Sequence, residues 1–472
     1  MTPEQFRTIG YRLVDWIAEY RANLPSRCVM SNERPGAIRE KLASFPPYSG
    51  DPFDAVLADF ERVVVPGITH WNHPSFFAGA PSSTSLAAVL GELLASGLGV
   101  SCTTWHASPA GTELEELVMD WFRQMLGLSD AFHGVIHDSS STAALVAALC
   151  ARERATDDLR LKDGLHASSP LTAYTSDQAH GCVEKAFMLA GIGRQHIRFI
   201  ETDERYAMRA DLLRTRVEDD LRAGLLPCII VGTIGTHDTA AVDPLVPVGR
   251  LASRYGIWLH IDAATAGAAM VAPECRPHWT GIEGADSLAV DLHRWLGAGM
   301  DCTAYYVRDT DRLQRVMSTS HHAGMDDETT SYRHWGIPSD RRFRALKCWF
   351  LLREQGTNGL IERVRRDIQH AKWLEAEVRK ADGWEVAAPV LFQTVCARHI
   401  PHGLSSAEIT SAEIDQHNLR WVERVNESGK AYLTSVLIDG RRVARISIGA
   451  EATELSHIRD LWALMQHCAG AR

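Results

Sequence analysis

The sequence predicts an α/β protein in which helices cover both faces of a mostly parallel central sheet. Between about residues 85 and 350, helical runs alternate with short apolar runs at 171–175, 227–232, 257–261 and 303–307. Strands that are apolar throughout are buried on both faces, as the strands of a parallel sheet are. With 472 residues, of which 45% are hydrophobic, the chain can bury a large core.

The first 84 residues predict a helical segment ahead of this sheet. Thr2, Pro3 and Glu4 suit the N-cap, the first position and the first turn of a helix. Apolar residues then recur at helical spacing, at Phe6, Ile9, Leu13, Ile17 and Tyr20. This apolar stripe packs either on the body of the same chain or on a second subunit. Loops rich in proline, glycine and serine follow at 34–36, 45–52 and 80–83.

The C-terminal part predicts a small α+β domain. From about residue 360 the chain carries one long helix, strand candidates near 390–396 and 445–448, and a closing helix. We therefore divide the chain into an N-terminal helical segment (1–84), a large domain (85–355) and a small C-terminal domain (356–472).

Composition argues against several classes of protein. The net charge of −10 is spread along the chain without a basic tract, so neither nucleic acid nor an anionic membrane surface is expected as a partner. No stretch reaches the roughly 18 apolar residues of a membrane helix, and the N-terminus lacks a signal-peptide pattern. A cytoplasmic protein is the expectation. The ten cysteines stand singly, without a Cys-x-x-Cys pair, and predict reduced thiols and no metal site.

Two segments predict a site for a ring and a phosphate. Asp262 ends an apolar run, where open α/β sheets place ligands, and its carboxylate could pair with a protonated pyridine nitrogen. An N-cap role is the alternative. Ser139 and Ser140 begin an alanine-rich helix whose free N–H groups suit a phosphate. Simple capping is the alternative there, and the carboxylate of Asp138 would have to point away from an anion.

Longer stretches of the chain resemble the group II pyridoxal-phosphate-dependent amino-acid decarboxylases and are similar to aromatic-L-amino-acid decarboxylase. The motifs are 258–267, 285–287 and 291–295, and the resemblance extends through 175–180, 232–236 and 331–335 to cover about residues 3–466. It implies fold type I, pyridoxal 5'-phosphate in the large domain, an amino acid or derivative as substrate, and decarboxylation. It also implies a homodimer with active sites across the interface and residues 1–84 packed on the second subunit.

The resemblance implies roles for individual residues. His180 would stack on the cofactor ring, Asp262 would hold the ring nitrogen, and Tyr332, in a mobile loop, would protonate the carbon that has lost carbon dioxide. Family members with phenylalanine at this last position form aldehydes, so Tyr332 favours amine formation. Further residues are implied near the phosphate or the ring: Ser139, Ser140, Thr236, Ala264 and His293.

Several positions expected in the substrate pocket depart from the family pattern. Gly79 and Ala80 stand where the aromatic-substrate enzymes have bulky aromatics, and Ser101 and Thr103 replace apolar residues. Together with Trp71, they would line a pocket that is wider and more polar than one shaped for phenylalanine or tyrosine. Neutral drift is the alternative.

Arg294 occupies the position of the lysine that forms the Schiff base with the cofactor in this family. A guanidinium stays protonated and is a poor nucleophile, so covalent attachment would be lost. Three accounts are open: an engineered, inactive form of an ordinary aromatic amino-acid decarboxylase; a natural enzyme with a non-covalently bound cofactor and lysine-independent chemistry; and a non-catalytic or repurposed protein. Departures from the family pattern around this position favour a natural residue over an engineered one, and retention of His180, Asp262, His293 and Tyr332 argues against a non-catalytic protein. Arg294 could then serve as a fixed cation for a substrate carboxylate or a phosphate.

Overall fold

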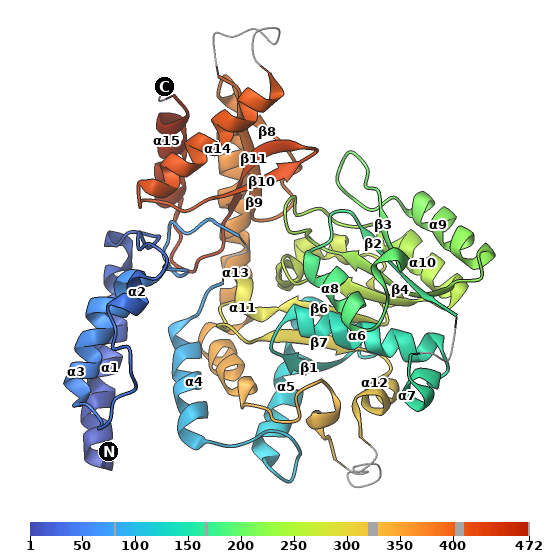
Figure 1. Cartoon of the computed structure of the whole chain (residues 1–472), viewed down its shortest axis with the longest axis horizontal. Coiled ribbons are helices and arrows are strands. Elements are labelled where there is room, and N and C mark those ends of the chain that lie inside the picture. The colour runs from blue at the N-terminus through green and yellow to red at the C-terminus, as the bar shows by residue number, and fades with distance from the viewer. Residues whose placement is uncertain (80–81, 166–168, 320–328, 402–409, 471–472) are drawn as a thin grey trace. The chain divides into compact units, whose positions relative to one another are not determined.

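The computed structural model describes residues 1–79, 82–165, 169–319, 329–401 and 410–470. The chain forms two compact units (Figure 1). The small unit comprises Met1–Pro81, Asp382–Glu385 and Ala397–Arg472, and the large unit comprises Ser82–Ala381 and Val386–Cys396. The domain boundaries that we inferred from the sequence stay a prediction.

A seven-stranded sheet forms the centre of the large unit, and its strand order is β1-β7-β6-β5-β4-β2-β3. All neighbouring strands pair in parallel except β7, which is antiparallel to β1 and to β6. The mostly parallel sheet is therefore confirmed. The strands are β1 (His133–His137), β2 (Leu171–Ser176), β3 (Ile197–Ile200), β4 (Leu226–Thr233), β5 (Trp258–Asp262), β6 (Ser287–Asp291) and β7 (Thr303–Val307).

Helices bury both faces of this sheet. In β4, Ile230 belongs to one hydrophobic cluster, whereas Ile229 and Val231 belong to the other, because successive side chains of a strand point to opposite faces. Helices α5, α10 and α13 contribute to the first cluster, and α6 and α8 to the second. The helices are α4 (Leu86–Leu98), α5 (Pro109–Leu126), α6 (Ser140–Ala155), α7 (Leu159–Asp163), α8 (Gly181–Leu189), α9 (Ala210–Arg222), α10 (Leu245–Tyr255), α11 (Leu292–Trp295), α12 (Thr310–Met317) and α13 (Arg344–Lys380).

The strand register brings polar side chains together at one edge of the sheet. The parallel strands β4, β5 and β6 end at Thr233, Asp262 and Asp291. Thr233 pairs with Asp262, and Asp291 pairs with Thr303 at the start of the antiparallel β7. The carboxyl ends of the parallel strands thus form the edge at which α/β proteins bind ligands.

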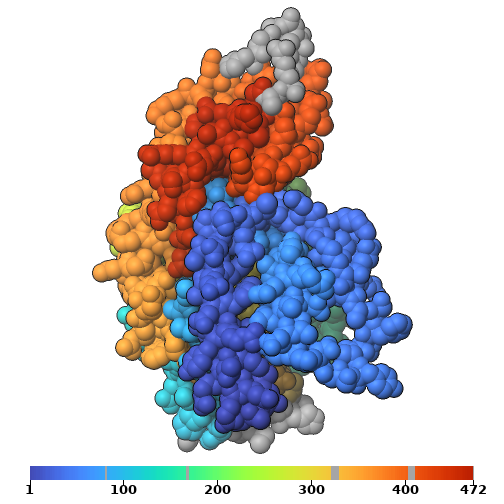
Figure 2. All heavy atoms as spheres, turned by 90° about the vertical axis from the view of Figure 1, so that its left-hand side faces the viewer, coloured from blue at the N-terminus to red at the C-terminus, as the bar shows by residue number. Residues whose placement is uncertain are grey.

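The small unit contains the N-terminal helices and most of a four-stranded sheet of order β10-β11-β9-β8. The predicted N-terminal helix is present as α1, with a capping box between Thr2 and Gln5. No residue of α1 is buried, and Figure 2 shows this helix, in the darkest blue, as open surface. The elements are α1 (Pro3–Asn23), α2 (Ala37–Glu40), α3 (Phe53–Asp59), α14 (Ser411–Glu427), α15 (Leu455–Gly470), β8 (Trp384–Val386), β9 (Thr394–His399), β10 (Thr434–Ile438) and β11 (Arg441–Ser447).

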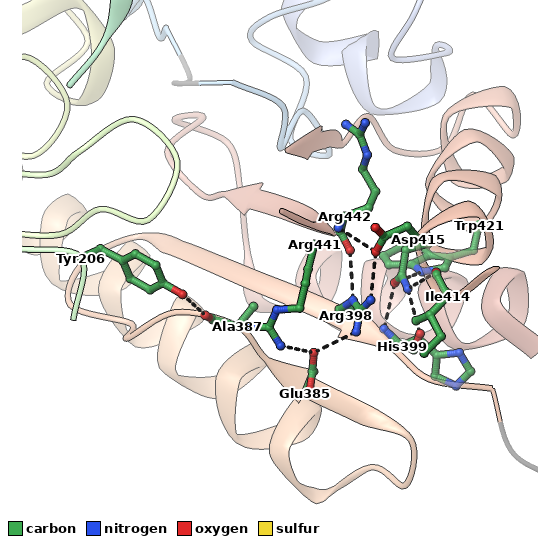
Figure 3. A network of polar contacts seen from close by, with 11 residues as sticks. Tyr206, Glu385, Ala387, Arg398, His399, Ile414, Asp415, Trp421, Arg441 and Arg442 are labelled. Carbon is green, nitrogen blue, oxygen red and sulfur yellow. Dashed lines mark hydrogen bonds and ion pairs between the residues drawn. The ribbon is translucent and has the colours of Figure 1, made fainter. Parts of the chain in front are cut away.

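Ion pairs hold the strands of the small unit to its helix α14 (Figure 3). Arg398 of β9 lies 2.9 Å from Asp415 of α14 and 3.6 Å from Glu385 of β8, and Arg441 of β11 lies 3.5 Å from the same glutamate. Arg398 is buried, so its two carboxylate partners offset the cost of removing a guanidinium from water. Within the described ranges, no helix is both long and apolar enough to span a bilayer.

Candidate active site

Asp262 lies at the centre of the polar edge and is only 8% exposed. Its Oδ1 accepts a hydrogen bond of 3.1 Å from the backbone N–H of Ala264. Burial raises the pKa of Asp262, and Asp291 raises it further, whereas Ala264, His180 and Arg294 lower it. Asp262 is therefore a desolvated carboxylate that gains from a cationic partner, as a protonated ring nitrogen would be.

The N-terminus of α6 lies beside this edge. Ser139 is its N-cap, and the Ser139 hydroxyl accepts a bond of 3.3 Å from the backbone N–H of Thr142. Ser140 is the first residue of the helix, so its N–H has no partner within the helix. The Ser139 hydroxyl also lies 3.4 Å from a carboxylate oxygen of Asp138. An anion at this helix end therefore requires the Asp138 carboxylate to turn away from Ser139.

His180 is an exposed N-cap residue of α8. Its Nδ1 accepts a bond of 3.3 Å from the backbone N–H of Cys182, so the ring proton is assigned to Nε2. The ring lies 5.2 Å from that of His237 at an interplanar angle of 53°. His180 is also close enough to Asp262 to lower the pKa of that carboxyl. A flat, exposed imidazole at this position suits stacking on a planar ligand.

Arg294 lies in the short helix α11 and forms an ion pair with the last residue of β6. Its Nε donates a bond of 2.6 Å to Oδ2 of Asp291, which is fully buried. The other oxygen of Asp291 accepts a bond of 2.5 Å from the hydroxyl of Thr303. The Arg294 side chain is 28% exposed, so the guanidinium reaches from the buried carboxylate toward solvent.

His293 is held rigidly beside this ion pair. Its Nδ1 lies 2.9 Å from the carbonyl oxygen of Cys302, and its Nε2 lies 3.8 Å from Asp291. The backbone carbonyl of His293 accepts bonds from the N–H of Ser83 and the hydroxyl of Ser82. The ring is 6% exposed, so its contribution to a ligand would come from one edge only.

Cys182 lies close to several of these groups. Its pKa is raised to about 12, chiefly by burial. Asp262 and Asp291 add to the rise of this pKa, whereas Ser141 at the start of α6 and Arg294 oppose it. One thiol on α8 is thus within electrostatic reach of strand ends β5 and β6, of the α6 N-terminus and of α11.

Two residues expected near the cofactor lie in tight turns of this edge. Thr236 is fully buried, and its hydroxyl lies 2.8 Å from that of Thr239 and accepts a bond from the N–H of Ala241. Its side chain therefore shapes the loop after β4. Ala264 is 7% exposed and contacts Asp262 through its backbone N–H.

The structure does not bring Tyr332 to this edge. Its ring is 2% exposed and contacts the ring of Trp335 at a centroid distance of 5.5 Å. Tyr332 lines a cavity of about 420 Å³ together with Gly134, near the start of β1, and Tyr306, near the end of β7. Because β1 and β7 are antiparallel, these residues lie at the end of the sheet opposite to Asp262. Because the active sites are expected across a subunit interface, the catalytic role expected for Tyr332 stays a prediction.

The expected substrate-pocket residues belong to both units. Ser101 is exposed and Thr103 half-buried in the large unit, where the Thr103 carbonyl accepts a bond from the backbone of Arg333. Trp71 belongs to the small unit, is 41% exposed and stacks on the ring of Phe76.

Gly79, also in the small unit, has a φ of 52°, a left-handed conformation that favours glycine. Its N–H donates to the hydroxyl of Thr434. Ala80 lies outside the described residues. These four described positions stay predictions as pocket residues.

Some residues at the carboxyl ends of the strands take part in the site although the sequence did not single them out. Asp291, Thr303 and Cys182 carry no motif of their own, and their role depends on the register of β6 with β7 and on the position of α8. The signal available in the sequence was the spacing of Asp291 and Arg294, which places the two side chains on one face of a helical turn.

The donor set fits pyridoxal phosphate in part. Among the residues that the structure describes, no cation lies at bonding distance from the buried Asp262 carboxylate, which suits the ring nitrogen, and a helix N-terminus with two serines suits the phosphate. Position 294 offers a guanidinium that is already bonded to a carboxylate, and this group does not supply the nucleophilic amine for covalent attachment.

Comparison with known proteins identifies the family. The protein-family model described as "Pyridoxal-dependent decarboxylase conserved domain" matches residues 35–400, and the chain belongs to this family. It is 36% identical to phenylacetaldehyde synthase from Arabidopsis thaliana over 99% of the chain and 96% of the relative. It is also 36% identical to aromatic-L-amino-acid decarboxylase from Catharanthus roseus, over 98% and 93%.

Solved structures agree with this assignment. The crystal structure of Oryza sativa TDC with PLP and tryptamine matches with a TM-score of 0.95 and 36% identity, covering 99% of this chain and 98% of that one. Catharanthus roseus tryptophan decarboxylase in complex with L-tryptophan matches with a TM-score of 0.93 and 35% identity over 99% of both chains. The predicted fold and the dependence of the family on pyridoxal phosphate are confirmed, and the relatives include decarboxylases, which are lyases.

Proposed function

We propose that this chain is a pyridoxal-phosphate enzyme that acts on an amino acid and holds its cofactor without a covalent bond to residue 294. The observation that supports this proposal most directly is the buried carboxylate of Asp262 at the carboxyl edge of β5, within electrostatic reach of His180 and Arg294. When bound, the cofactor supplies an electron sink for charge that develops at the substrate's α-carbon.

Each residue of the edge has a role in this proposal. Asp262 keeps the ring nitrogen protonated, and His180 stacks on the ring with its Nε2 proton available to an oxygen of the substrate. The N–H groups at the α6 N-terminus, with the hydroxyls of Ser139 and Ser140, hold the phosphate, and His293 lies beside it. Thr236 and Ala264 shape the loops that contact the ring.

Arg294 separates this chain from a covalent pyridoxal-phosphate enzyme. The resemblance puts the attachment lysine of the family at this position, and an arginine keeps the positive charge but offers no free amine. An incoming amino acid would therefore have to react without displacing a lysine, which slows turnover or changes the reaction. Ser101, Thr103, Trp71, Gly79 and Ala80 are the proposed contacts for its side chain.

We also propose that the chain forms a homodimer. Five leucines of α4 are between 47% and 60% exposed: Leu86, Leu90, Leu93, Leu94 and Leu98. Their spacing puts them along one side of the helix. A row of exposed leucines is unusual on a monomer and marks an interface. In the small unit, Phe6 and Tyr11 of α1 are also more than half exposed, at 61% and 67%.

The test is an absorbance titration of the purified protein with pyridoxal phosphate, followed by borohydride reduction and intact-mass measurement. We expect saturable binding, no reducible adduct, and weaker binding by Asp262→Asn. Arg294→Lys should create a reducible adduct at residue 294, which peptide mapping locates. Absence of binding would overturn the cofactor-dependent proposal in favour of a repurposed scaffold, and a reducible adduct in the unaltered protein would show that another lysine has taken over attachment.

A further inference from the structure

Asp291 fixes the direction in which Arg294 presents its charge. The Asp291 carboxylate is fully buried, and a buried charge needs a partner of opposite sign. The Nε of Arg294 supplies that partner at 2.6 Å, and the hydroxyl of Thr303 bonds the second oxygen at 2.5 Å. Because the guanidinium is planar and rigid, a bond at Nε sets the directions of the two terminal nitrogens.

These terminal nitrogens remain available for a ligand. Among the residues that the structure describes, none accepts a hydrogen bond from the Nη atoms of Arg294, and 28% of the side chain is exposed. Arg294 is bonded to the last residue of β6, the strand beside β5, which ends at Asp262, and its charge is within electrostatic reach of Asp262 and of Cys182. A planar pair of N–H donors matches the two oxygens of a carboxylate.

We propose that Arg294, oriented by Asp291, binds the α-carboxylate of the amino-acid substrate. This inference rests on the proposed function. The ring nitrogen and the phosphate of the cofactor have partners at Asp262 and at the α6 N-terminus. The substrate carboxylate is the remaining anion in the site, and among the described residues Asp291 is the one anionic ligand of the guanidinium. Asp291 acts as a positioning residue, because it contacts Arg294 and not the substrate.

This contact bears on the reaction. Loss of carbon dioxide breaks the bond between the α-carbon and the carboxylate carbon, leaves the electron pair on the α-carbon and removes the negative charge from the carboxylate. An ion pair with Arg294 therefore stabilises the reactant more than the transition state, and it opposes decarboxylation. The site favours reactions of the amino acid in which the carboxylate is retained.

The test uses two stable, reduced adducts, phosphopyridoxyl-L-tryptophan and phosphopyridoxyl-tryptamine, which differ only in the carboxylate. Calorimetric titration of the unaltered protein should give about tenfold tighter binding of the tryptophan adduct, the lower end expected for a hydrogen-bonded charge at a partly exposed site. Arg294→Gln should abolish this preference. Asp291→Asn should reduce it several-fold while Thr303 keeps its bonding partner.

A matched control is Arg222→Gln in α9. Arg222 forms an ion pair with Asp219 at the same sequence separation, but on an exposed surface, and its loss should leave the preference unchanged. The melting temperature of each variant checks that the fold is retained. Arg294→Lys, which keeps the positive charge, should retain part of the preference, because an ammonium attracts a carboxylate but lacks the planar pair of N–H donors of a guanidinium.

Several results would overturn the inference. Equal affinity of the unaltered protein for both adducts would do so, as would a preference that persists in Arg294→Gln. If Arg294→Gln instead weakened the binding of both adducts equally, and did not weaken the binding of dephosphorylated pyridoxyl-tryptophan, the guanidinium would be bonded to the phosphate and not to the carboxylate. Failure of both adducts to bind the unaltered protein would overturn the proposed function itself.

Discussion

Removal of the Arg294 charge should destabilise the β6–β7 edge, because Asp291 would remain buried without a cation. Breaking a buried ion pair at one side costs about 3–5 kcal/mol. The Arg294 side chain is 28% exposed, so water can reach the vacated position, and we expect about 2–3 kcal/mol for Arg294→Met. Asp291→Asn keeps an acceptor for the Thr303 hydroxyl and should cost about 1–2 kcal/mol.

The double variant separates the pair interaction from these single costs. With both charges gone, no buried charge is left unpaired, so the combined loss should be smaller than the sum by about 1–2 kcal/mol. Hydrogen exchange of peptides that cover β6 and β7 reports the local opening free energy. This local measurement is preferable because global unfolding of a two-unit chain need not be a single transition.

The control is the same comparison of single and double variants at the exposed pair Arg222 and Asp219. The interaction energy between these two residues should be about 0.3–0.5 kcal/mol. Additive effects of Arg294→Met and Asp291→Asn, within about 0.5 kcal/mol, would refute the reasoning. They would mean that water or another group neutralises Asp291, and that the orientation of Arg294 has no energetic basis.

Three further predictions follow from burial and exposure. Leu90→Glu combined with Leu94→Glu should convert the dimer to a monomer, as measured by light scattering after size exclusion. The control Leu221→Glu, at an exposed leucine of α9, should leave the dimer intact. An unchanged molar mass for the α4 variant would contradict the proposed interface. Tyr332→Phe should leave cofactor affinity within about twofold, because within one chain the ring lies away from Asp262 and the variant keeps its packing; a loss of more than tenfold would show that the Tyr332 hydroxyl contributes to cofactor binding. Burial lowers the pKa of His137 to about 4 from 6.5, so the folded state keeps His137 neutral and loses stability as the pH falls from 6.5 to about 4, by about 3 kcal/mol at the acid end. In His137→Gln, the denaturation midpoint should depend less on pH over this range. If the variant and the unaltered protein gave the same dependence of the midpoint on pH, His137 would make no contribution.

The central sheet could be predicted from the sequence because its strands are apolar on both faces. The runs at 171–175 and 257–261 coincide with β2 (Leu171–Ser176) and β5 (Trp258–Asp262) to within one residue at each end. The strands of the small unit were placed less well, since 445–448 was expected where β11 is Arg441–Ser447. Two arginines begin β11, and a hydrophobic pattern does not mark a strand that starts with charged residues.

The site was predictable where a single residue ends a strand, and less so where the register decides. Asp262 follows an apolar run, so its position at the sheet edge could be inferred. The contact between Asp291 and Thr303 depends on the antiparallel pairing of β6 with β7, which no local pattern encodes. Tyr332 follows a polar stretch that suggested an accessible loop, but its large ring is buried against Trp335, and burial of an aromatic ring outweighs the polarity of its neighbours in sequence.

Asp291 places an electrostatic constraint on position 294. A carboxylate that is fully buried at the end of β6 requires a cation within bonding distance, and residue 294 is the nearest candidate in the same helical turn. Lysine and arginine both satisfy this electrostatic requirement, whereas only lysine can form a covalent bond with an aldehyde. The fold therefore tolerates an arginine at this position at little cost in stability. Under the proposed function, the carboxylate of a substrate is a ligand that would use both of the remaining nitrogens of the guanidinium.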